Sequence, residues 1–369
     1  MYDGSISFLN YAERQDGTAI ATRLYYEELV RNGKNVDWIQ LSDYYHPEKY
    51  LNSGILVPGS KLPIRGARVG FDRLIYFPRQ LRKLKLSRAL FLADPSLIRI
   101  GLKHGDFMIK VHDLIPITKY SESRFYTAMI NYAIPRLKLA KKIIVTTNYM
   151  KSLISPYVEE KDDIHVVTEP VNISLDPNKT KRHLSKTDKK SQFNVTYIAA
   201  DRPYKNLKFF IDLADYFQQK NIANYRFLLV SRLRPETLEY LKSLKLKNLT
   251  VLSNLSDISE IYYDTDIFVN VSLQEGFGRP NVEAMAFGIP IVAGKTEPFM
   301  EILGEVGAFA EEGNLENWFE NIMKVSEPEN YNRLSNLALA RFRNFYSYDI
   351  FSHQLAKAFD SFLECLDLE

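Results

Sequence analysis

The sequence predicts an α/β fold of two domains, each with a parallel sheet covered by helices. Short apolar runs rich in β-branched residues alternate with longer amphipathic segments, which is typical of strands joined by helices. A chain of 369 residues exceeds one ordinary hydrophobic core, so two domains are expected. A hydrophobic share of 46% is that of a globular protein and not of a disordered one.

The first half of the chain carries two candidate functional segments. Asp16-Gly17-Thr18 precedes a predicted helix over 19–32, which Gly33 closes. Residues 107–113 form a predicted strand that ends in His112-Asp113. A histidine there can act as general acid, general base or sugar ligand, and the alternative is a turn with a satisfied imidazole.

The domain boundary is predicted near Glu169-Pro170. A short strand over 164–168 ends there, and residues 172–192 follow with the lysine-rich, aperiodic composition of a linker. The second half then begins with a strand, a helix and a strand over residues 194–200, 207–219 and 225–230.

Two cations lie in the first turn of the second half. Arg202 and Lys205 follow the strand over 194–200, and Asn206 is a candidate helix cap. In an open parallel sheet this is the edge where ligands bind, so the pair could neutralise a diphosphate. Two solvated turn charges are the alternative.

A glycine-rich turn follows a predicted strand over 266–272. Gly276 and Gly278 allow a sharp turn and close approach of a ligand, and Pro280 suits the first position of a helix. Gly288 suits the helix end, and Pro290 opens the next strand over 290–293. The N-terminus of such a helix favours a phosphate.

Two carboxylates flank the start of this helix. Glu275 stands at the end of the strand without a structural partner in sequence, so we expect it to meet a ligand hydroxyl. We place Glu283 in the first helical turn, where it could also stabilise the helix dipole.

The segment resembles the donor-site signature of the family-4 glycosyltransferases, E-G-F-G-x-P-x-x-E-A-x-x-x-G-x-P-x-V. Every fixed position is met, by Glu275, Gly276, Phe277, Gly278, Pro280, Glu283, Ala284, Gly288, Pro290 and Val292. That family has the GT-B architecture, in which two Rossmann-like β/α/β domains face a central cleft.

The resemblance implies roles for individual residues. It places Glu275 and His112 on the transferred sugar, Glu283 on the nucleotide ribose, and Arg202 and Lys205 on the diphosphate. The donor-binding residues that it implies are Gly17, Gly276, Phe277, Gly278, Pro280 and Glu283. The family's usual glycine before the cationic turn is Ala199 or Ala200 here. The segment 141–149 resembles the family's strand and helix start, and N-capping is the alternative for Thr147 and Asn148.

The resemblance also implies the domain limits. Predicted helices over 317–324, 332–344 and 348–366 end the chain. In the family the last helix returns to the first domain. The acceptor-side domain is therefore expected over 1–170 with about 346–369, and the nucleotide-sugar domain over 171–345.

The expected function is that of a retaining glycosyltransferase. It would move a hexose from a nucleotide-diphosphate sugar to a glycan or lipid-linked acceptor, in glycan or cell-surface polysaccharide assembly. No cofactor or metal is expected, because Asp264-Thr-Asp266 is interpreted as the polar entry to a strand and not as a metal motif. The alternatives are a non-catalytic nucleotide-sugar-binding module and another GT-B enzyme of epimerase or phosphorylase type.

Charge and cysteine content predict the location. A net charge of +3 gives no argument for a nucleic-acid partner. A single cysteine, Cys365, fits a reducing compartment, so a cytoplasmic protein is expected. Residues 79–88 alternate cations with leucines at helical spacing, which suits either an ordinary surface helix or peripheral contact with the inner membrane surface.

Overall fold

The computed structural model describes residues 5–10, 17–42, 54–60, 71–121, 123–171, 192–255 and 257–367. These residues form two compact units, which are described separately. Unit 1 comprises Met1–Pro170 and Tyr348–Glu369, and unit 2 comprises Val171–Ser347. The predicted linker lies outside the described residues, except for Gln192.

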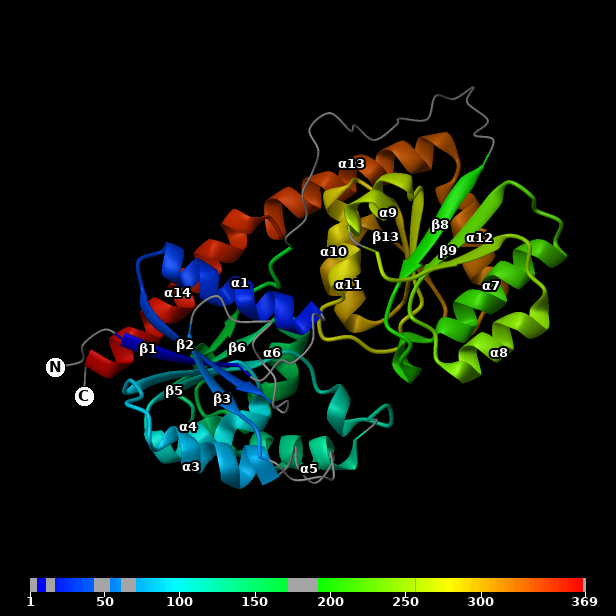
Figure 1. The fold of residues 1–369 in the computed structure, drawn as a ribbon. Coiled ribbons are helices and arrows are strands. Elements are labelled where there is room, and N and C mark those ends of the chain that lie inside the picture. Colours follow the sequence, from blue (N-terminus) through cyan, green and yellow to red (C-terminus); the bar gives the residue numbers. More distant parts are fainter. Residues whose placement is uncertain are drawn as a thin grey trace. The chain divides into compact units, whose positions relative to one another are not determined.

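Unit 1 is built from alternating strands and helices (Figure 1). Its main elements are β1 (Ser5–Asn10), α1 (Gly17–Arg31), β2 (Asn35–Ser42), β3 (Ile55–Pro58), α3 (Phe77–Leu81), β4 (Ala89–Leu92), α4 (Ile98–His104), β5 (Phe107–Val111), α5 (Arg124–Ala133), β6 (Lys142–Val145), α6 (Asn148–Ile154), β7 (Ile164–Val166) and α14 (Tyr348–Asp367). The described strands pair in parallel in the order β3-β2-β1-β4-β5-β6-β7.

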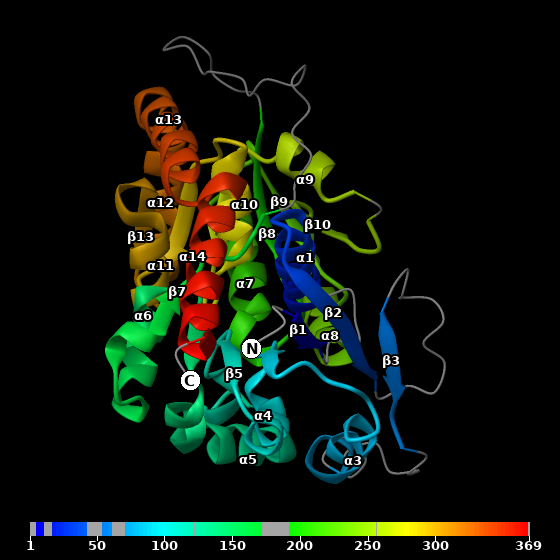
Figure 2. The same cartoon turned by 90° about the vertical axis from the view of Figure 1, so that its left-hand side faces the viewer.

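The sheet of unit 1 has an apolar core on each face. Helices α1 and α14 pack against Phe8 and Phe91 on one face. Helices α3, α4, α5 and α6 pack against Leu90 and Ile109 on the other. Because both faces are covered, β4 is an unbroken buried run, Ala-Leu-Phe-Leu. Figure 2 shows α14 beside these strands, although the chain reaches it only after unit 2.

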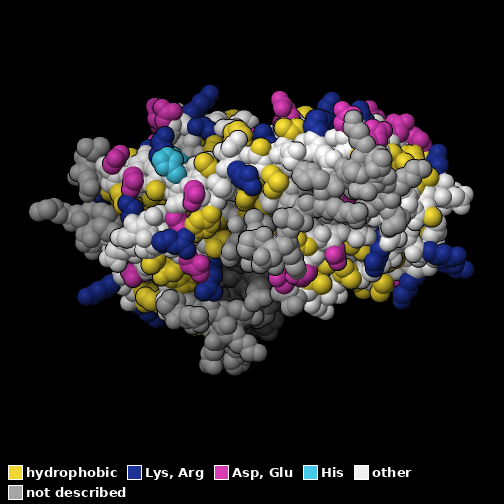
Figure 3. Space-filling view, turned by 90° about the horizontal axis from the view of Figure 1, so that it is seen from above, with side chains coloured by type: hydrophobic (Ala, Val, Ile, Leu, Met, Phe, Trp, Pro, Cys, Tyr) yellow, Lys and Arg dark blue, Asp and Glu magenta, His cyan; other side chains and the backbone are white. Residues whose placement is uncertain are grey.

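The outer surface of α1 and α14 carries charges of both signs. Arg23 pairs with Glu27, and Lys34 of the α1–β2 connection pairs with Asp360 of α14. Figure 3 views unit 1 from this side and shows Lys/Arg and Asp/Glu side chains mixed over it. Such exposed pairs contribute little to stability, about 0–1 kcal/mol each.

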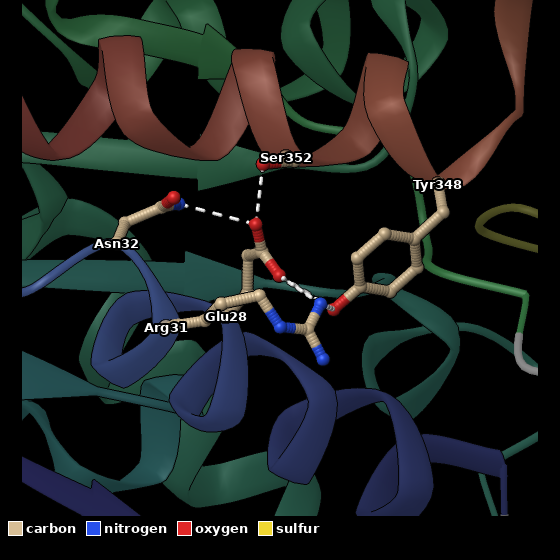
Figure 4. A network of polar contacts seen from close by, with 5 residues as sticks. All are labelled: Glu28, Arg31, Asn32, Tyr348 and Ser352. Carbon is tan, nitrogen blue, oxygen red and sulfur yellow. Dashed lines mark hydrogen bonds and ion pairs between the residues drawn. The ribbon is translucent and has the colours of Figure 1, made fainter.

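A buried carboxylate joins α1 to the start of α14 (Figure 4). Glu28 is 2% exposed and accepts hydrogen bonds from Tyr348 (2.6 Å), Arg31 (2.8 Å), Asn32 (3.1 Å) and Ser352. Burial alone would raise the pKa of Glu28, but these partners outweigh burial and lower it. The ionised carboxylate therefore fastens α14 to unit 1 at its first turn.

Unit 2 has the same alternation of strands and helices (Figure 1). Its main elements are β8 (Phe193–Ile198), α7 (Leu207–Gln219), β9 (Tyr225–Val230), α8 (Pro235–Leu244), β10 (Leu249–Leu252), α9 (Ser259–Asp264), β11 (Ile267–Asn270), α10 (Arg279–Ala286), β12 (Ile291–Gly294), α11 (Glu297–Leu303), β13 (Gly307–Ala310), α12 (Leu315–Val325) and α13 (Pro328–Phe345). The described strands are parallel in the order β10-β9-β8-β11-β12-β13. Helices α7, α8 and α12 cover one face, and α9, α10 and α11 cover the other.

The predicted α/β fold is confirmed, and α7 and β9 have the predicted bounds. The predicted helix over 79–88 is wrong, because α3 ends at Leu81 and a turn follows. Leu81 is buried, and Leu84 and Leu86 pack against the unit 1 core, so the leucines form no exposed apolar face. The exposed cations of this segment are Arg79, Arg82, Lys83, Lys85 and Arg88. Among the described residues, no helix has the length and hydropathy needed to cross a bilayer.

Candidate active site

The glycine turn of unit 2 lies at the carboxyl end of the buried strand β11. Gly278 has a φ of +85°, and a Cβ on it would lie 2.9 Å from the Phe299 ring, so glycine is required for two reasons. The side chain of Asn270 donates to Asn281 Oδ1 (3.0 Å), which fixes the start of α10 against the strand. Pro280 lies in the first turn of α10 but is its second residue, because the helix begins at Arg279 and not at Pro280 as predicted.

An ion pair joins the cationic turn to the glycine turn. The Lys205 ammonium contacts the Glu275 carboxylate, and their side chains are 16% and 10% exposed. The resemblance implied different parts of the donor for these two residues, and their contact was not predicted. They follow β8 and β11, the neighbouring strands at which the strand order reverses, and open α/β sheets bind ligands at this point.

Backbone contacts hold the two turns together. The Tyr197 hydroxyl donates to the Lys205 carbonyl (2.7 Å) and contacts Ser272 Oγ (2.8 Å). The Leu273 N–H donates to the Tyr204 carbonyl (2.7 Å). Burial raises the pKa of the Tyr197 hydroxyl well above its usual range, so it remains a neutral donor. The position of Lys205 is therefore set by the sheet itself.

Glu283 lies in the second turn of α10 and not in the first, because the helix begins at Arg279. The interpretation as a first-turn dipole partner is therefore wrong. Its carboxylate accepts from the Tyr262 hydroxyl (2.5 Å) and pairs with Arg279 (3.2 Å). Burial, and then the charge of Glu283, raise the pKa of Tyr262 well above its usual range. Tyr262 and Arg279 were not singled out in the sequence.

The rest of the cationic turn follows β8 as predicted, with one correction. Arg202 precedes the short 3₁₀ turn Pro203–Lys205 and is half-buried. Asn206 precedes α7, but its side chain makes no capping bond, and its φ of +55° is left-handed. Asparagine tolerates that conformation better than most residues, so Asn206 turns the backbone here.

Asp264 and Asp266 serve the opposite end of the sheet. The Asn194 N–H donates to Asp266 Oδ2 (2.8 Å), and the Asn194 amide donates to the Asp264 carbonyl (2.8 Å). These contacts join the amino-terminal ends of β8 and β11. Glu275 lies beyond the carboxyl end of β11, so the two aspartates are not brought to it.

In unit 1, His112 follows β5 and belongs to a charged cluster. His112 Nδ1 lies 3.0 Å from Glu169 Oε1, and Lys110 Nζ lies 2.8 Å from the same oxygen. The Lys110 side chain is fully buried, and its ammonium lies 3.7 Å from the centre of the Tyr25 ring. The Glu169 side chain is 4% exposed. In the sequence, Glu169 was named only as part of the domain boundary. The one sequence signal for a buried carboxylate partner was Lys110, a lysine within the apolar strand β5.

Other predicted residues of unit 1 lie on helix starts. Gly17 is the first described residue of α1. Thr147 caps α6 by accepting from the Met150 N–H (3.1 Å), so the capping alternative is confirmed for it. Asn148 is the first residue of α6. The satisfied-imidazole alternative for His112 holds only for Nδ1, because Nε2 is buried without a hydrogen-bond partner among the described residues.

Comparisons with known proteins agree with this geometry. Residues 178–339 match the family model "Glycosyl transferases group 1", which covers the cationic turn and the glycine turn of unit 2. The chain is 24% identical over 148 residues to the capsular polysaccharide biosynthesis glycosyltransferase CapM of Staphylococcus aureus, covering 38% of this chain and 39% of that one. It is 22% identical over 238 residues to the O-antigen chain mannosyltransferase RfbU of Salmonella typhimurium, covering 62% and 63%. The aligned parts thus span less than two thirds of these relatives.

The solved structures extend the match to both units. The crystal structure of Anabaena Alr3699/HepE in complex with UDP and glucose has a TM-score of 0.72 and 16% identity, and it covers 96% of this chain and 99% of that one. Two Rossmann-like units with parallel sheets are the GT-B architecture. The chain therefore has the GT-B fold, and residues 178–339 resemble the group 1 glycosyltransferases.

Proposed function

We propose that this chain is a retaining, family-4-like glycosyltransferase that moves a hexose from a nucleotide-diphosphate sugar to a glycan or lipid-linked acceptor. The observation that carries the proposal is the Lys205–Glu275 pair at the sheet's switch point. A cation and a carboxylate there match the two parts of such a donor, its diphosphate and its sugar hydroxyls.

The chemistry follows from where charge develops. When the bond between the anomeric carbon and the diphosphate breaks, negative charge grows on the leaving phosphate. Lys205, Arg202 and the N-terminus of α10 would stabilise that charge electrostatically. Lys205 is already paired with Glu275 in unit 2, so phosphate binding would draw the ammonium from one anion towards another.

Retention is proposed from the resemblance to the family-4 glycosyltransferases, and among the described residues of this site no side chain is an evident nucleophile for a covalent intermediate. Glu275 is paired with Lys205, and Glu283 is held by Arg279 and Tyr262. In the proposed step the leaving phosphate takes the proton of the acceptor hydroxyl, while the acceptor oxygen attacks the same face of the sugar. Glu275 and His112 orient the sugar, and Glu283 binds the ribose.

The acceptor class is proposed from the relatives. Two of them are a capsular polysaccharide glycosyltransferase and an O-antigen chain mannosyltransferase, so assembly of cell-surface polysaccharide is the best-supported role. We propose that the protein acts in the cytoplasm. We also propose that the exposed cations of residues 79–88 bind an anionic membrane electrostatically.

The test is a thermal-shift screen of the full chain with UDP, GDP, UDP-glucose, UDP-N-acetylglucosamine and GDP-mannose. A ligand at about 100 times its Kd adds roughly 2.7 kcal/mol to the free energy of unfolding. The donor found in this way is then incubated with a glycan panel, and nuclear magnetic resonance reads the anomeric configuration of the product. Retention with release of nucleoside diphosphate is expected.

Three results would contradict the proposal. An inverted product would refute the retaining mechanism. Conversion of the donor sugar to its epimer without acceptor would indicate an epimerase. Tight donor binding without turnover on any acceptor, unchanged in Glu275→Gln, would indicate a binding module. Glu320→Gln, on the exposed surface of α12, is the matched control for loss of a carboxylate.

A further inference from the structure

Unit 1 holds three buried groups behind His112 that the proposed reaction leaves unused: Glu169, Lys110 and Tyr25. They come from three elements, since Tyr25 lies on α1, Lys110 lies within β5, and Glu169 follows β7. The Tyr25 hydroxyl donates to the Val167 carbonyl (3.2 Å), so the ring beneath the Lys110 ammonium is itself fixed. The carboxylate that faces His112 is thus held by packing and charge.

The charge state of Glu169 decides the proton on His112. Burial alone would raise the pKa of the Glu169 carboxyl, but Lys110 and His112 outweigh burial and hold it well below its usual range. An ionised carboxylate only accepts hydrogen bonds. At a distance of 3.0 Å, Nδ1 of His112 must therefore carry the proton that it donates to Glu169.

The other ring nitrogen is left as an acceptor. In a neutral imidazole with its proton on Nδ1, Nε2 presents a lone pair. Nε2 of His112 is buried and has no hydrogen-bond partner in the described part of the chain. A buried acceptor without a partner is costly, and the described residues supply no donor to Nε2, so a donor from a ligand would satisfy it. A sugar hydroxyl is such a donor.

We propose that Glu169, paired with Lys110, is a positioning residue that keeps His112 in the Nδ1–H tautomer, so that Nε2 accepts a hydrogen bond from a hydroxyl of the transferred sugar. The sugar-binding part of this inference rests on the proposed function. The ammonium of Lys110 supplies the counter-charge of Glu169, so the carboxylate does not need a protonated imidazole to balance it.

The tautomer can be observed directly. The full chain is labelled with nitrogen-15 histidine, and long-range proton–nitrogen spectra are recorded about two pH units above the ordinary imidazole pKa of about 6.5. His112→Gln assigns the His112 signals among the six histidines. The wild-type chain is expected to show a protonated Nδ1 and a bare Nε2. A proton on Nε2 in the wild-type chain would overturn the proposal.

Two variants test the cause. Glu169→Gln can turn an amide N–H towards Nδ1, so the proton of His112 should move towards Nε2. Because that variant removes the charge that Glu169 presents to the buried Lys110, the double variant Lys110→Met/Glu169→Gln removes both charges and protects the fold. His165→Gln, in β7 outside the cluster, is the matched control. An unchanged His112 tautomer in both variants would refute positioning by Glu169.

The kinetic readout separates positioning from folding. With the donor identified by the thermal-shift screen, kcat of both variants should fall about 10- to 100-fold, the range of one hydrogen bond to a charged group. Their Kd for the nucleoside diphosphate, which lacks the sugar, should stay within about twofold. A loss of nucleotide affinity equal to the loss in kcat would overturn the assignment. The tautomer spectrum needs no substrate, so it decides the positioning role even if the transfer assay fails.

Discussion

Replacing Lys205 by alanine should weaken nucleoside-diphosphate binding more than replacing any other cation of unit 2. A charge-assisted hydrogen bond to phosphate is worth about 1.5–3 kcal/mol, which corresponds to roughly 10- to 100-fold in Kd. In the structure this ammonium also balances the Glu275 carboxylate, and both side chains are largely buried. Lys205→Ala would therefore remove the attraction between the ammonium and the diphosphate. It would also leave the diphosphate repelled by the Glu275 carboxylate.

The repulsion can be estimated. Two like charges on the order of 8 Å apart cost about 2 kcal/mol at an effective dielectric constant of about 20. The total loss in Lys205→Ala should then be about 3.5–5 kcal/mol. Arg202→Ala should lose only the attraction, about 1.5–3 kcal/mol. Adding Glu275→Gln to Lys205→Ala should recover the repulsive part, which is roughly 30-fold in Kd.

The assay is isothermal titration of UDP or GDP, whichever the screen identifies, into the single and double variants. Lys208→Ala, which removes the exposed cation at the second position of α7, is the control and should keep wild-type affinity. If Lys205→Ala and Arg202→Ala lose equal affinity and Glu275→Gln recovers none of it, Glu275 does not repel the diphosphate when Lys205 is absent, and the predicted coupling within the pair is refuted.

Four further outcomes are expected. Glu283→Gln should lower both nucleotide affinity and kcat, whereas Glu275→Gln should lower kcat and leave nucleotide affinity equal or higher; the reverse pattern in titration and kinetics would exchange their roles. Transfer should persist in a metal chelator, and its loss with rescue by Mg²⁺ or Mn²⁺ would show a metal requirement. Co-sedimentation with anionic vesicles should fall when the cations of 79–88 become serine, at about 1 kcal/mol per cation; absence of binding by the wild-type chain would rule out the contact. Glu28→Gln should lower the free energy of unfolding by about 1–3 kcal/mol near neutral pH. Because the folded-state pKa of Glu28 lies below its ordinary value of 4.5, that difference should be complete above pH 4.5 and shrink as pH falls further, and a pH-independent difference in denaturant melts would refute it.

Short sequence patterns correctly predicted individual helices, strands and turns, because these depend mainly on neighbouring residues. The bounds of α7 and β9 follow from apolar periodicity, and Gly278 and Pro280 mark the turn into α10. The error at Glu283 has a simple origin, because α10 starts one residue earlier than Pro280. A shift of one residue moves a carboxylate from the first turn to the second and changes its partners from helix N–H groups to side chains.

Contacts between distant segments could not be predicted in this way. Glu169 lies 57 residues from His112, and the two meet only because β5, β6 and β7 are consecutive in the sheet. Glu275 lies 70 residues from Lys205, and they meet because β11 pairs with β8. Neither contact leaves a pattern among neighbouring residues. The chemical groups of the site could therefore be predicted from the sequence, but the residues that they contact could not.

The return of α14 to unit 1 has a consequence for synthesis of the chain on the ribosome. Unit 2 is one continuous stretch, Val171–Ser347, whereas unit 1 needs both Met1–Pro170 and a helix translated after unit 2. Until that helix emerges, the face of the sheet that carries Phe8 and Phe91 has no cover from α14. Domains usually complete their folding in the order of translation. Here the second unit is complete before the first, and the Glu28 network closes only in the last step.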